Sequence, residues 1–274
     1  MYYRNDLGLE YPDKCDEHMI TVKHKRDAIF DTEYSYIDKS LRYKLIRIIY
    51  WLLVTGIVFP LMHLTHGLKI HGKENYKKHR SELKNGAITV SNHVFYWDYL
   101  CVLKAIRPHL AFFPAWKTNF EGSNAALIRM SGGIPVPTDS AHAMMKFNRA
   151  MEEILESGKW LHFFPEGSMW FYYPDIRPLK KAVFCYAVKY NKPIIPISLS
   201  FRPRRGITKH FTKKPFVDLH IGEPVYPDPT LPCRQAEEKL QATVYHTMQV
   251  MNGINPGDPT YNTDLNPAHY KKTM

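Results

Sequence analysis

The stretch AITVSNHVFYWDYLCVLKAI, residues 87–106, sets a pattern that the rest of the chain repeats. Residues 87–90 form a short apolar run with β-branched side chains, which is typical of a buried strand. The run ends at Ser91 and Asn92, and a helical pattern extends from about Tyr96 to Ile106. The sequence therefore predicts a strand, a tight turn and a helix in immediate succession.

Strand-like and helix-like segments alternate along the whole chain. This alternation indicates an α/β fold with a central, mostly parallel sheet flanked by helices, in which functional groups follow the strand ends. A Pro/Asn/Gly-rich tail after residue 251 is expected to be loosely held. Further strands are predicted at 68–72, 110–113, 134–136, 160–164, 194–199 and 216–221, and further helices at 125–130, 141–157, 179–190 and 234–251.

The charge balance points to a polyanionic partner. The 274 residues carry a formal net charge of +11, which suits either nucleic acid or an anionic membrane surface. The cysteines are far apart and form no CxxC pair, which argues against a zinc site and a disulfide framework and fits a reducing cytosol. These cysteines are Cys15, Cys101, Cys185 and Cys233.

One segment suggests contact with a membrane. Residues 48–64, IIYWLLVTGIVFPLMHL, hold no Asp, Glu, Lys or Arg, and Asp38 or Ser40 can cap a helix through them that ends near Gly67. A spanning helix needs about 20 apolar residues, and Gly56 and Pro60 would loosen this one. Insertion into one leaflet is the favoured interpretation, and a buried core helix is the alternative. Three basic residues that can meet anionic headgroups precede it: Arg42, Lys44 and Arg47.

His93 and Asp98 are candidates for a catalytic pair. Five residues apart in a regular helix, their side chains would point about 140° away from each other. They can meet if His93 lies in the turn after the strand and Asp98 lies in the first turn of the helix. A carboxylate that holds an imidazole in this way makes it a general base. With fourteen histidines in the chain, however, the HxxxxD spacing alone is a weak signal.

The stretch FFPEGS, residues 163–168, is a second candidate. It places the carboxylate of Glu166 at a strand end, next to Gly167, whose backbone N–H could approach a ligand closely and act as an oxyanion donor. The alternative is a plain turn with a capping glutamate. GxSxG, HExxH and glycine-rich phosphate-loop patterns are absent from the sequence, and His63 and His66 fit an apolar helix better than a metal site, so no metal is predicted.

Taken together, four stretches resemble the ordered blocks of the lysophospholipid/glycerol-phosphate acyltransferase family (PlsC-type). The resemblance covers roughly residues 68–225 and implies a glycerol-phosphate acyltransferase-like fold. The blocks are NHVFYWD (92–98), GGIPVP (132–137), FFPEGS (163–168) and PIIPIS (193–198).

The resemblance implies a role for each matching residue. His93 would take the proton from the acceptor hydroxyl and Asp98 would orient it, so that the hydroxyl attacks an acyl thioester directly, without a covalent acyl-enzyme. Glu166 and Gly167 would line the acceptor site and stabilise the oxyanion. The second block would lie beside the acceptor, through Gly133, Ile134 and Pro135.

The sequence departs from the family pattern where a phosphate would bind. The third block lacks its usual arginine after Gly167, and the second block ends in Pro137 and Thr138 instead of a basic residue. The aromatic run 170–173 in the gap would suit a bulkier or less anionic acceptor. The candidates for phosphate binding are Lys180 and Lys181, in a segment that resembles the one following the third block, together with Arg177 and Arg149.

The predicted protein is therefore a membrane-associated O-acyltransferase that needs no cofactor. Its co-substrate is acyl-CoA or acyl carrier protein, and its acceptor is a lysophospholipid, with 1-acylglycerol-3-phosphate first among the candidates. Alternatives are another lysophospholipid, glycolipid or aminolipid acceptor, or a non-enzymatic basic protein that binds lipid or nucleic acid. No nucleic-acid partner is expected.

Two parts and a location are predicted from the same features. Residues 1–67 would form a leader with the membrane-associating helix, and residues 68–274 the α/β acyltransferase domain with its C-terminal helix and tail. The first forty residues hold no apolar run of the kind a secretory signal needs. The expected location is the cytoplasmic face of a membrane, with peripheral or monotopic attachment and anionic lipid as partner.

Overall fold

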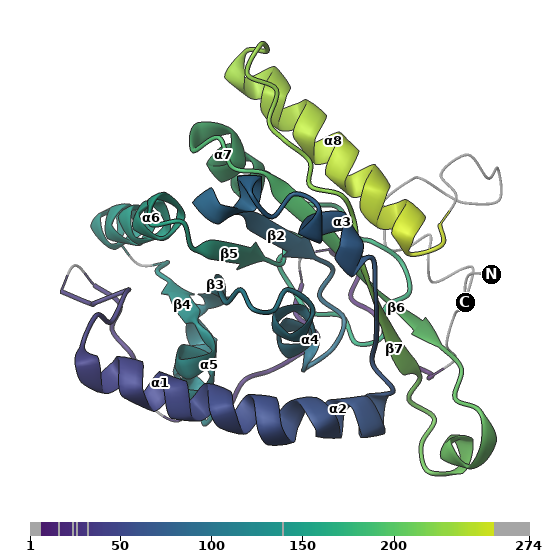
Figure 1. Ribbon diagram of the computed structural model, residues 1–274. Helices are drawn as coiled ribbons and strands as arrows, with labels where there is room; N and C mark the ends of the chain where they lie inside the picture. Colours follow the sequence, from purple (N-terminus) through teal and green to yellow (C-terminus); the bar gives the residue numbers. More distant parts are fainter. Residues whose placement is uncertain are drawn as a thin grey trace.

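A computed structural model describes residues 7–254 except 16, 24, 26, 32 and 139, so most of the predicted tail lies outside the described residues. Its centre is a seven-stranded sheet with helices on both faces (Figure 1). The strands are β1 (Lys69–His71), β2 (Ile88–Ser91), β3 (Ala111–Trp116), β4 (Gly133–Val136), β5 (Trp160–Phe163), β6 (Ile194–Arg202) and β7 (Phe216–Ile221). The α-helices after β1 are α3 (Lys73–Lys77), α4 (Asp98–Ala105), α5 (Ala125–Ser131), α6 (Ala141–Glu156), α7 (Ala182–Lys189) and α8 (Cys233–Met251).

The sheet has the strand order β1-β7-β6-β2-β5-β3-β4. The β6–β7 pair is antiparallel, and the other pairs are parallel. The predicted α/β fold with a mostly parallel central sheet is therefore confirmed. β6 runs to Arg202, beyond the predicted end at 199, because its last residues pair with β7 as far as Phe216.

Two hydrophobic cores lie on the two faces of the sheet. The alternation of side chains along a strand divides β6 between them: Ile195 and Ile197 join the core that includes α4, and Ile194 joins the core of α6, α7 and α8. Both sides of the central strands are thus covered, so the residues of β2 and most of those of β6 are buried, the polar Thr89, Ser91 and Ser198 among them.

The apolar segment forms one long helical rod outside α4, along the bottom edge of Figure 1. Ser40 caps α1 (Leu41–Leu53), a π-helical turn η1 (Val54–Val58) follows, and α2 (Phe59–His66) ends at Gly67 in a left-handed conformation. Since Pro60 has no N–H to donate, the loosening predicted around Gly56 takes the form of this π turn. Most of the rod's apolar side chains are exposed, so it is not a buried core helix.

Candidate functional site

The loops that follow β2 and β5 meet at one edge of the sheet. These strands pair in parallel, so their C-terminal ends lie side by side. The backbone N–H of Trp170 donates to the carbonyl of His93 at 3.0 Å, and that of Tyr172 donates to the carbonyl of Val94 at 2.8 Å. The aromatic run after the third block therefore holds the first block in place through its backbone.

His93 and Asp98 are in direct contact. The Nδ1 of His93 lies 2.6 Å from Oδ2 of Asp98, because α4 begins at Asp98 and His93 lies in the turn before it. A carboxylate only accepts hydrogen bonds, so Nδ1 of the neutral imidazole carries the proton and Nε2 keeps its lone pair. The ring stacks on Phe164 at 3.9 Å, and 26% of the His93 side chain remains exposed. The imidazole is thus fixed and still reachable by a substrate.

The carboxylate of Asp98 is held from several sides. Oδ2 also accepts hydrogen bonds from the N–H groups of Val94 and Phe95 at 3.1 and 3.3 Å, and Oδ1 accepts from Tyr99 N–H at 2.7 Å. These donors belong to the turn and to the first turn of α4, where a negative charge is favourable. Asp98 is consequently rigid, and it fixes the ring orientation of His93.

Glu166 has a different place from the one predicted. Its side chain is fully buried and forms an ion pair with Arg177, whose Nη2 lies 2.8 Å from Oε2. The carboxylate also accepts hydrogen bonds from the backbone N–H groups of His93 at 3.0 Å and Arg177 at 2.8 Å. All of these interactions occur inside the protein, so the carboxylate positions the His93 loop, and its role in the acceptor site stays a prediction.

Arg177 is likewise unsuited to bind a phosphate. Only 2% of the residue is exposed, and besides the Glu166 carboxylate it donates from Nη1 to Ser168 Oγ and to the carbonyl of Cys15, both at 2.7 Å. The guanidinium stands 4.4 Å from the ring centre of Trp170. A cation enclosed in this way supports the loop, so the structure favours a structural role for Arg177 over its predicted role as a phosphate ligand.

The N–H of Gly167 is also occupied, because it donates to the carbonyl of Phe164 at 3.0 Å. Its predicted role as an oxyanion donor is therefore unsupported in this conformation. Gly167 has φ of 84°, and an added Cβ would lie 2.7 Å from Cε of Lys180. Glycine is required here by the backbone and by the lysine packed against it. Lys180 thus lies beside the third block and remains a candidate for phosphate binding.

The other predicted site residues lie further away. Lys181 is exposed next to α7, and Arg149 is exposed in the middle of α6, on the side facing solvent. Gly133, Ile134 and Pro135 are buried in β4, which is three strand spacings, or about 14 Å, from β2. Their roles stay predictions.

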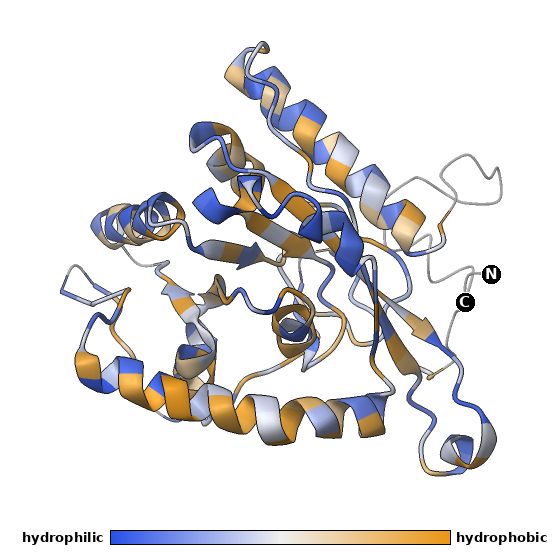
Figure 2. Ribbon diagram, in the orientation of Figure 1, coloured by the Kyte–Doolittle hydropathy of each residue, from blue (hydrophilic) through white to orange (hydrophobic). Residues whose placement is uncertain are grey.

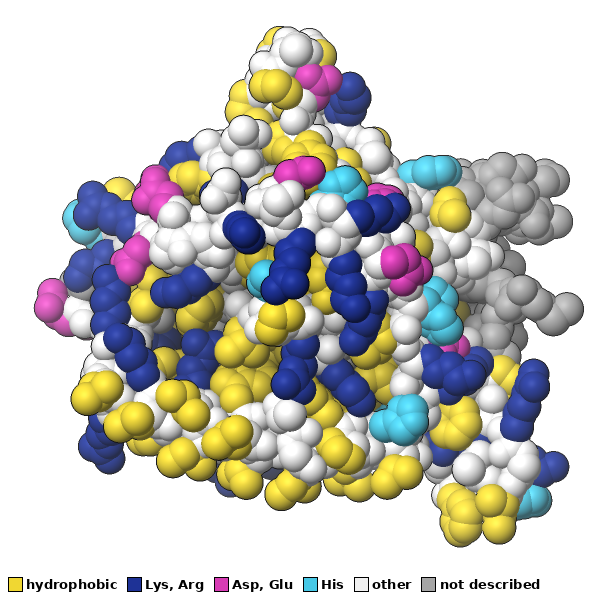
Figure 3. Space-filling model, viewed as in Figure 1, with side chains coloured by type: hydrophobic (Ala, Val, Ile, Leu, Met, Phe, Trp, Pro, Cys, Tyr) yellow, Lys and Arg dark blue, Asp and Glu magenta, His cyan; other side chains and the backbone are white. Residues whose placement is uncertain are grey.

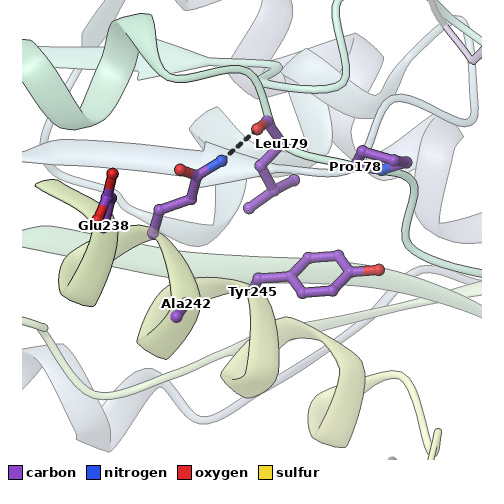
Figure 4. Close-up of a pocket in the computed structure, with 6 residues that line it drawn as sticks. Pro178, Leu179, Glu238, Ala242 and Tyr245 are labelled. Carbon is purple, nitrogen blue, oxygen red and sulfur yellow. Dashed lines mark hydrogen bonds between the residues drawn. The ribbon is translucent and has the colours of Figure 1, made fainter. Parts of the chain in front are cut away.

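Two cavities are formed elsewhere in the described part of the chain. One, of about 370 Å³, lies at the C-terminal end of β4, on the same sheet edge as His93; it is lined by Val136, Pro137, Thr138, Ser140, Ala141 and Met144. The other, of about 270 Å³, lies between α8 and residues 178–179, where Gln241 donates to the carbonyl of Leu179 (Figure 4). Only the cavity at the end of β4 adjoins one of the predicted blocks, namely the second block, residues 132–137.

The leader contributes a part of the site that the sequence did not suggest. Besides the Cys15 contact, Trp170 Nε1 donates to the carbonyl of Glu17 at 2.9 Å, and the hydroxyl of Tyr11 donates to the carbonyl of Phe171 at 3.0 Å. Tyr11, Cys15 and Glu17 therefore contact the third block or the aromatic run that follows it. Long-range contacts between an irregular segment and a loop leave no periodic pattern, so no sequence signal was available.

His162 is a second histidine of the site region that sequence reasoning missed. It lies within β5, fully buried, with Nδ1 at 2.9 Å from Thr89 Oγ1 and Nε2 at 3.4 Å from Ser91 Oγ. Burial, and next the neighbouring His93, lower the pKa of His162 to about 3. The signal was a lone histidine inside an apolar strand, and it indicates a neutral, hydrogen-bonded core residue.

This lowered pKa makes stability dependent on pH. Below about pH 6.5 the unfolded chain binds a proton at His162 that the folded chain does not, so the free energy of unfolding falls as pH decreases, by about 3 kcal/mol near pH 4. Asp175 acts oppositely, because burial raises its pKa to about 7. We expect urea unfolding of His162→Gln to lose less stability than wild type over this range, and His246→Gln, an exposed change, to follow wild type. Parallel curves for wild type and His162→Gln would contradict the assignment.

No group of three or more His, Cys, Asp or Glu in the described residues could hold a metal ion. The absence of a cofactor and of a metal stays a prediction.

Comparison with known proteins gives one family. The model of the family described as Acyltransferase matches residues 67–200, which contain the loops of His93 and Glu166 and the strand β4. No curated protein sequence matches the chain. Among solved structures, the chain is similar to the crystal structure of the 1-acyl-sn-glycerophosphate (LPA) acyltransferase PlsC from Thermotoga maritima, with 19% identity, 77% of this chain and 96% of that chain covered, and a TM-score of 0.47.

Proposed function

We propose that this chain, whose residues 67–200 match the model of the Acyltransferase family, transfers a fatty acyl group from acyl-CoA or acyl carrier protein to the hydroxyl of a lysophospholipid. The first candidate for the acceptor is 1-acylglycerol-3-phosphate, which would place the enzyme in phospholipid biosynthesis. The family match confirms the acyltransferase assignment that the four ordered blocks predicted; donor and acceptor belong to the proposal.

The observation that carries the proposal is the contact between His93 and Asp98. Nε2 of His93 would take the proton of the acceptor hydroxyl as its oxygen attacks the thioester carbonyl. The tetrahedral intermediate then expels the thiolate, which receives the proton back from the imidazolium. Asp98, buried and 2.6 Å from Nδ1, would stabilise that imidazolium in between. The ester bond forms as the thioester bond breaks, and no enzyme nucleophile is needed.

The headgroup of the acceptor is the open part of the proposal. Arg177 is enclosed by its ion pair, and Arg149 faces solvent, so the remaining candidate cations are Lys180 and Lys181. Two exposed lysines on a single segment favour a phosphate less strongly than the arginines of the usual blocks would. An acyltransferase for a lysophospholipid with a larger or less anionic headgroup is therefore the second candidate.

A panel of acceptors distinguishes these candidates. The protein is incubated with one acyl-CoA and lysolipids that differ only in headgroup, and products are identified by mass spectrometry. We expect a diacyl product, with free thiol released only when donor and acceptor are both present. Product from 1-acylglycerol-3-phosphate that decreases in Lys180→Ala favours the first candidate. Thiol release that does not require any lipid acceptor would contradict acyl transfer altogether.

The proposed location is a membrane surface, on its cytoplasmic side. Residues 41–66 form one helix that is long and apolar enough to cross a membrane. Figure 2 shows hydrophobic residues along most of this rod, whereas α8 is mixed. The exposed apolar side chains are Leu41, Leu45, Ile46, Ile48, Ile49, Leu52, Leu53, Ile57, Leu61 and Leu64.

Contacts along the rod support attachment within one leaflet over a spanning helix. A helix that crosses a bilayer must stand away from its soluble domain, but this one is bonded to it near both ends. The hydroxyl of Tyr43 donates to Arg129 O at 3.0 Å, and Arg204 Nη2 donates to Thr65 O at 2.6 Å. Between them, Lys104 Nζ donates to Phe59 O at 3.1 Å. With its inner side packed, the rod would lie in the plane of the interface.

A further inference from the structure

The connection between β6 and β7, residues 203–215, presents unusually exposed apolar side chains. It contains a short 3₁₀ turn, η4 (Gly206–His210). Ile207 is 72% exposed and Phe211 is 77% exposed. Among the described residues, no other large apolar side chain has a greater exposed fraction than Phe211. Exposing such side chains to water is unfavourable, so they indicate a surface that is covered in use.

The same loop is strongly basic. No Asp or Glu occurs from 201 to 217, and five lysines and arginines lie between Pro203 and Pro215. They are Arg204, Arg205, Lys209, Lys213 and Lys214. Two apolar residues surrounded by cations complement an anionic lipid surface, in which acyl chains lie under a layer of phosphates.

The loop is fixed to the end of the apolar rod. Arg204 bridges the two, because its Nη2 donates to Thr65 O of α2 and its Nε donates to Lys214 O, both at 2.6 Å. Arg202 also donates to the carbonyl of Gly67. In Figure 3, hydrophobic side chains at the tip of this loop, at the lower right, reach the same edge of the molecule as the row along α1 and α2.

We propose that loop 203–215 is a second membrane-binding element, which inserts Ile207 and Phe211 into the anionic leaflet on which α1–η1–α2 lies. A single rod in the interface leaves the protein able to rotate about the rod axis. A second contact beside its end removes that rotation and fixes the height of the His93 loop above the headgroups. The inference rests on the proposed membrane contact of the rod, but not on acyl transfer.

Binding to vesicles of phosphatidylcholine and phosphatidylglycerol, without donor or acceptor, tests the loop. We expect Phe211→Asp to lower the partition coefficient about tenfold, because a buried aromatic ring is replaced by a charge that the leaflet repels. Val250→Asp is the matched control: it changes an apolar residue that is also exposed, near the end of α8, which packs on the other face of the sheet from α4, and should bind as wild type does. The double variant Leu52→Asp/Ile57→Asp changes two exposed apolar residues of the rod, so its binding to vesicles measures the contribution of the rod separately.

Depth of insertion provides an independent measurement. The tryptophan added in Phe211→Trp should be quenched by brominated acyl chains, whereas the one added in Val250→Trp should not. The five native tryptophans are present in both variants, so they contribute the same background. Wild-type binding by Phe211→Asp, together with an unquenched Trp at 211, would overturn the loop proposal and leave the rod untouched. Failure of the wild-type protein to bind would overturn both membrane contacts, with acyl transfer still to be judged by the acceptor panel.

Discussion

Replacing His93 with alanine is expected to lower kcat/KM for acyl transfer by about 10³-fold, because the reaction loses its general base. The unprotonated Nε2 of His93 is the partly exposed basic group that Asp98 orients, at 2.6 Å from Nδ1. The measurement is the rate of thiol release with acyl-CoA and the preferred lysolipid. Far-UV circular dichroism and the urea midpoint should stay close to those of wild type, since His93 is not part of either core.

Two further variants sharpen this prediction. Asp98→Asn should lose about 10²-fold, because the amide keeps an acceptor for Nδ1–H but no longer stabilises the imidazolium, and its NH₂ faces backbone donors. His246→Ala, an exposed histidine of α8, should retain wild-type activity. His93→Ala within tenfold of wild type would refute the assignment of His93 as the base.

The second large effect concerns stability. Arg177→Met should reduce the free energy of unfolding by about 3–5 kcal/mol, because it leaves the Glu166 carboxylate buried without its cation. The Ser168 and Cys15 contacts of the guanidinium are lost as well. Urea unfolding of wild type, Arg177→Met, Glu166→Gln and the double variant measures the coupling directly.

The double variant is expected to be more stable than Arg177→Met alone, since a neutral amide is less costly to bury than an unpaired carboxylate. Arg149→Met provides the matched control, because that arginine is exposed on α6 and should change stability by less than about 0.5 kcal/mol. A loss under about 1 kcal/mol in Arg177→Met would show that the ion pair does not support the loop.

Both predictions describe one assembly. The Glu166 carboxylate accepts the backbone N–H of His93, and Arg177 holds that carboxylate and the leader's Cys15 carbonyl. A variant that frees the third block should therefore loosen the His93 loop before it unfolds the sheet. In this chain the Glu166 carboxylate of the third block positions the His93 loop.

Local patterns sufficed for the fold and for the pair. The β-branched run before Ser91 and the helical run after Tyr96 placed a strand and a helix on either side of His93, and the 3.6-residue period showed that only a turn could join it to Asp98. The apolar rod followed from its composition and from the cap at Ser40. Each of these features depends on residues that are close in sequence, so periodicity and capping rules apply to them directly.

What the tertiary structure alone decided involves charges and surfaces that are distant in sequence. Whether Glu166 and Arg177 bind substrate or each other depends on burial, because the same side chains are ligands at a surface and an ion pair inside the protein. His162, Tyr11, Cys15 and Glu17 belong to the site region only through chain folding. The rod and the basic loop share one edge because Arg204 of the loop donates a hydrogen bond to Thr65 of the rod, 139 positions earlier in the sequence. The sequence by itself determined the pair His93 and Asp98, and the packing determined what holds it.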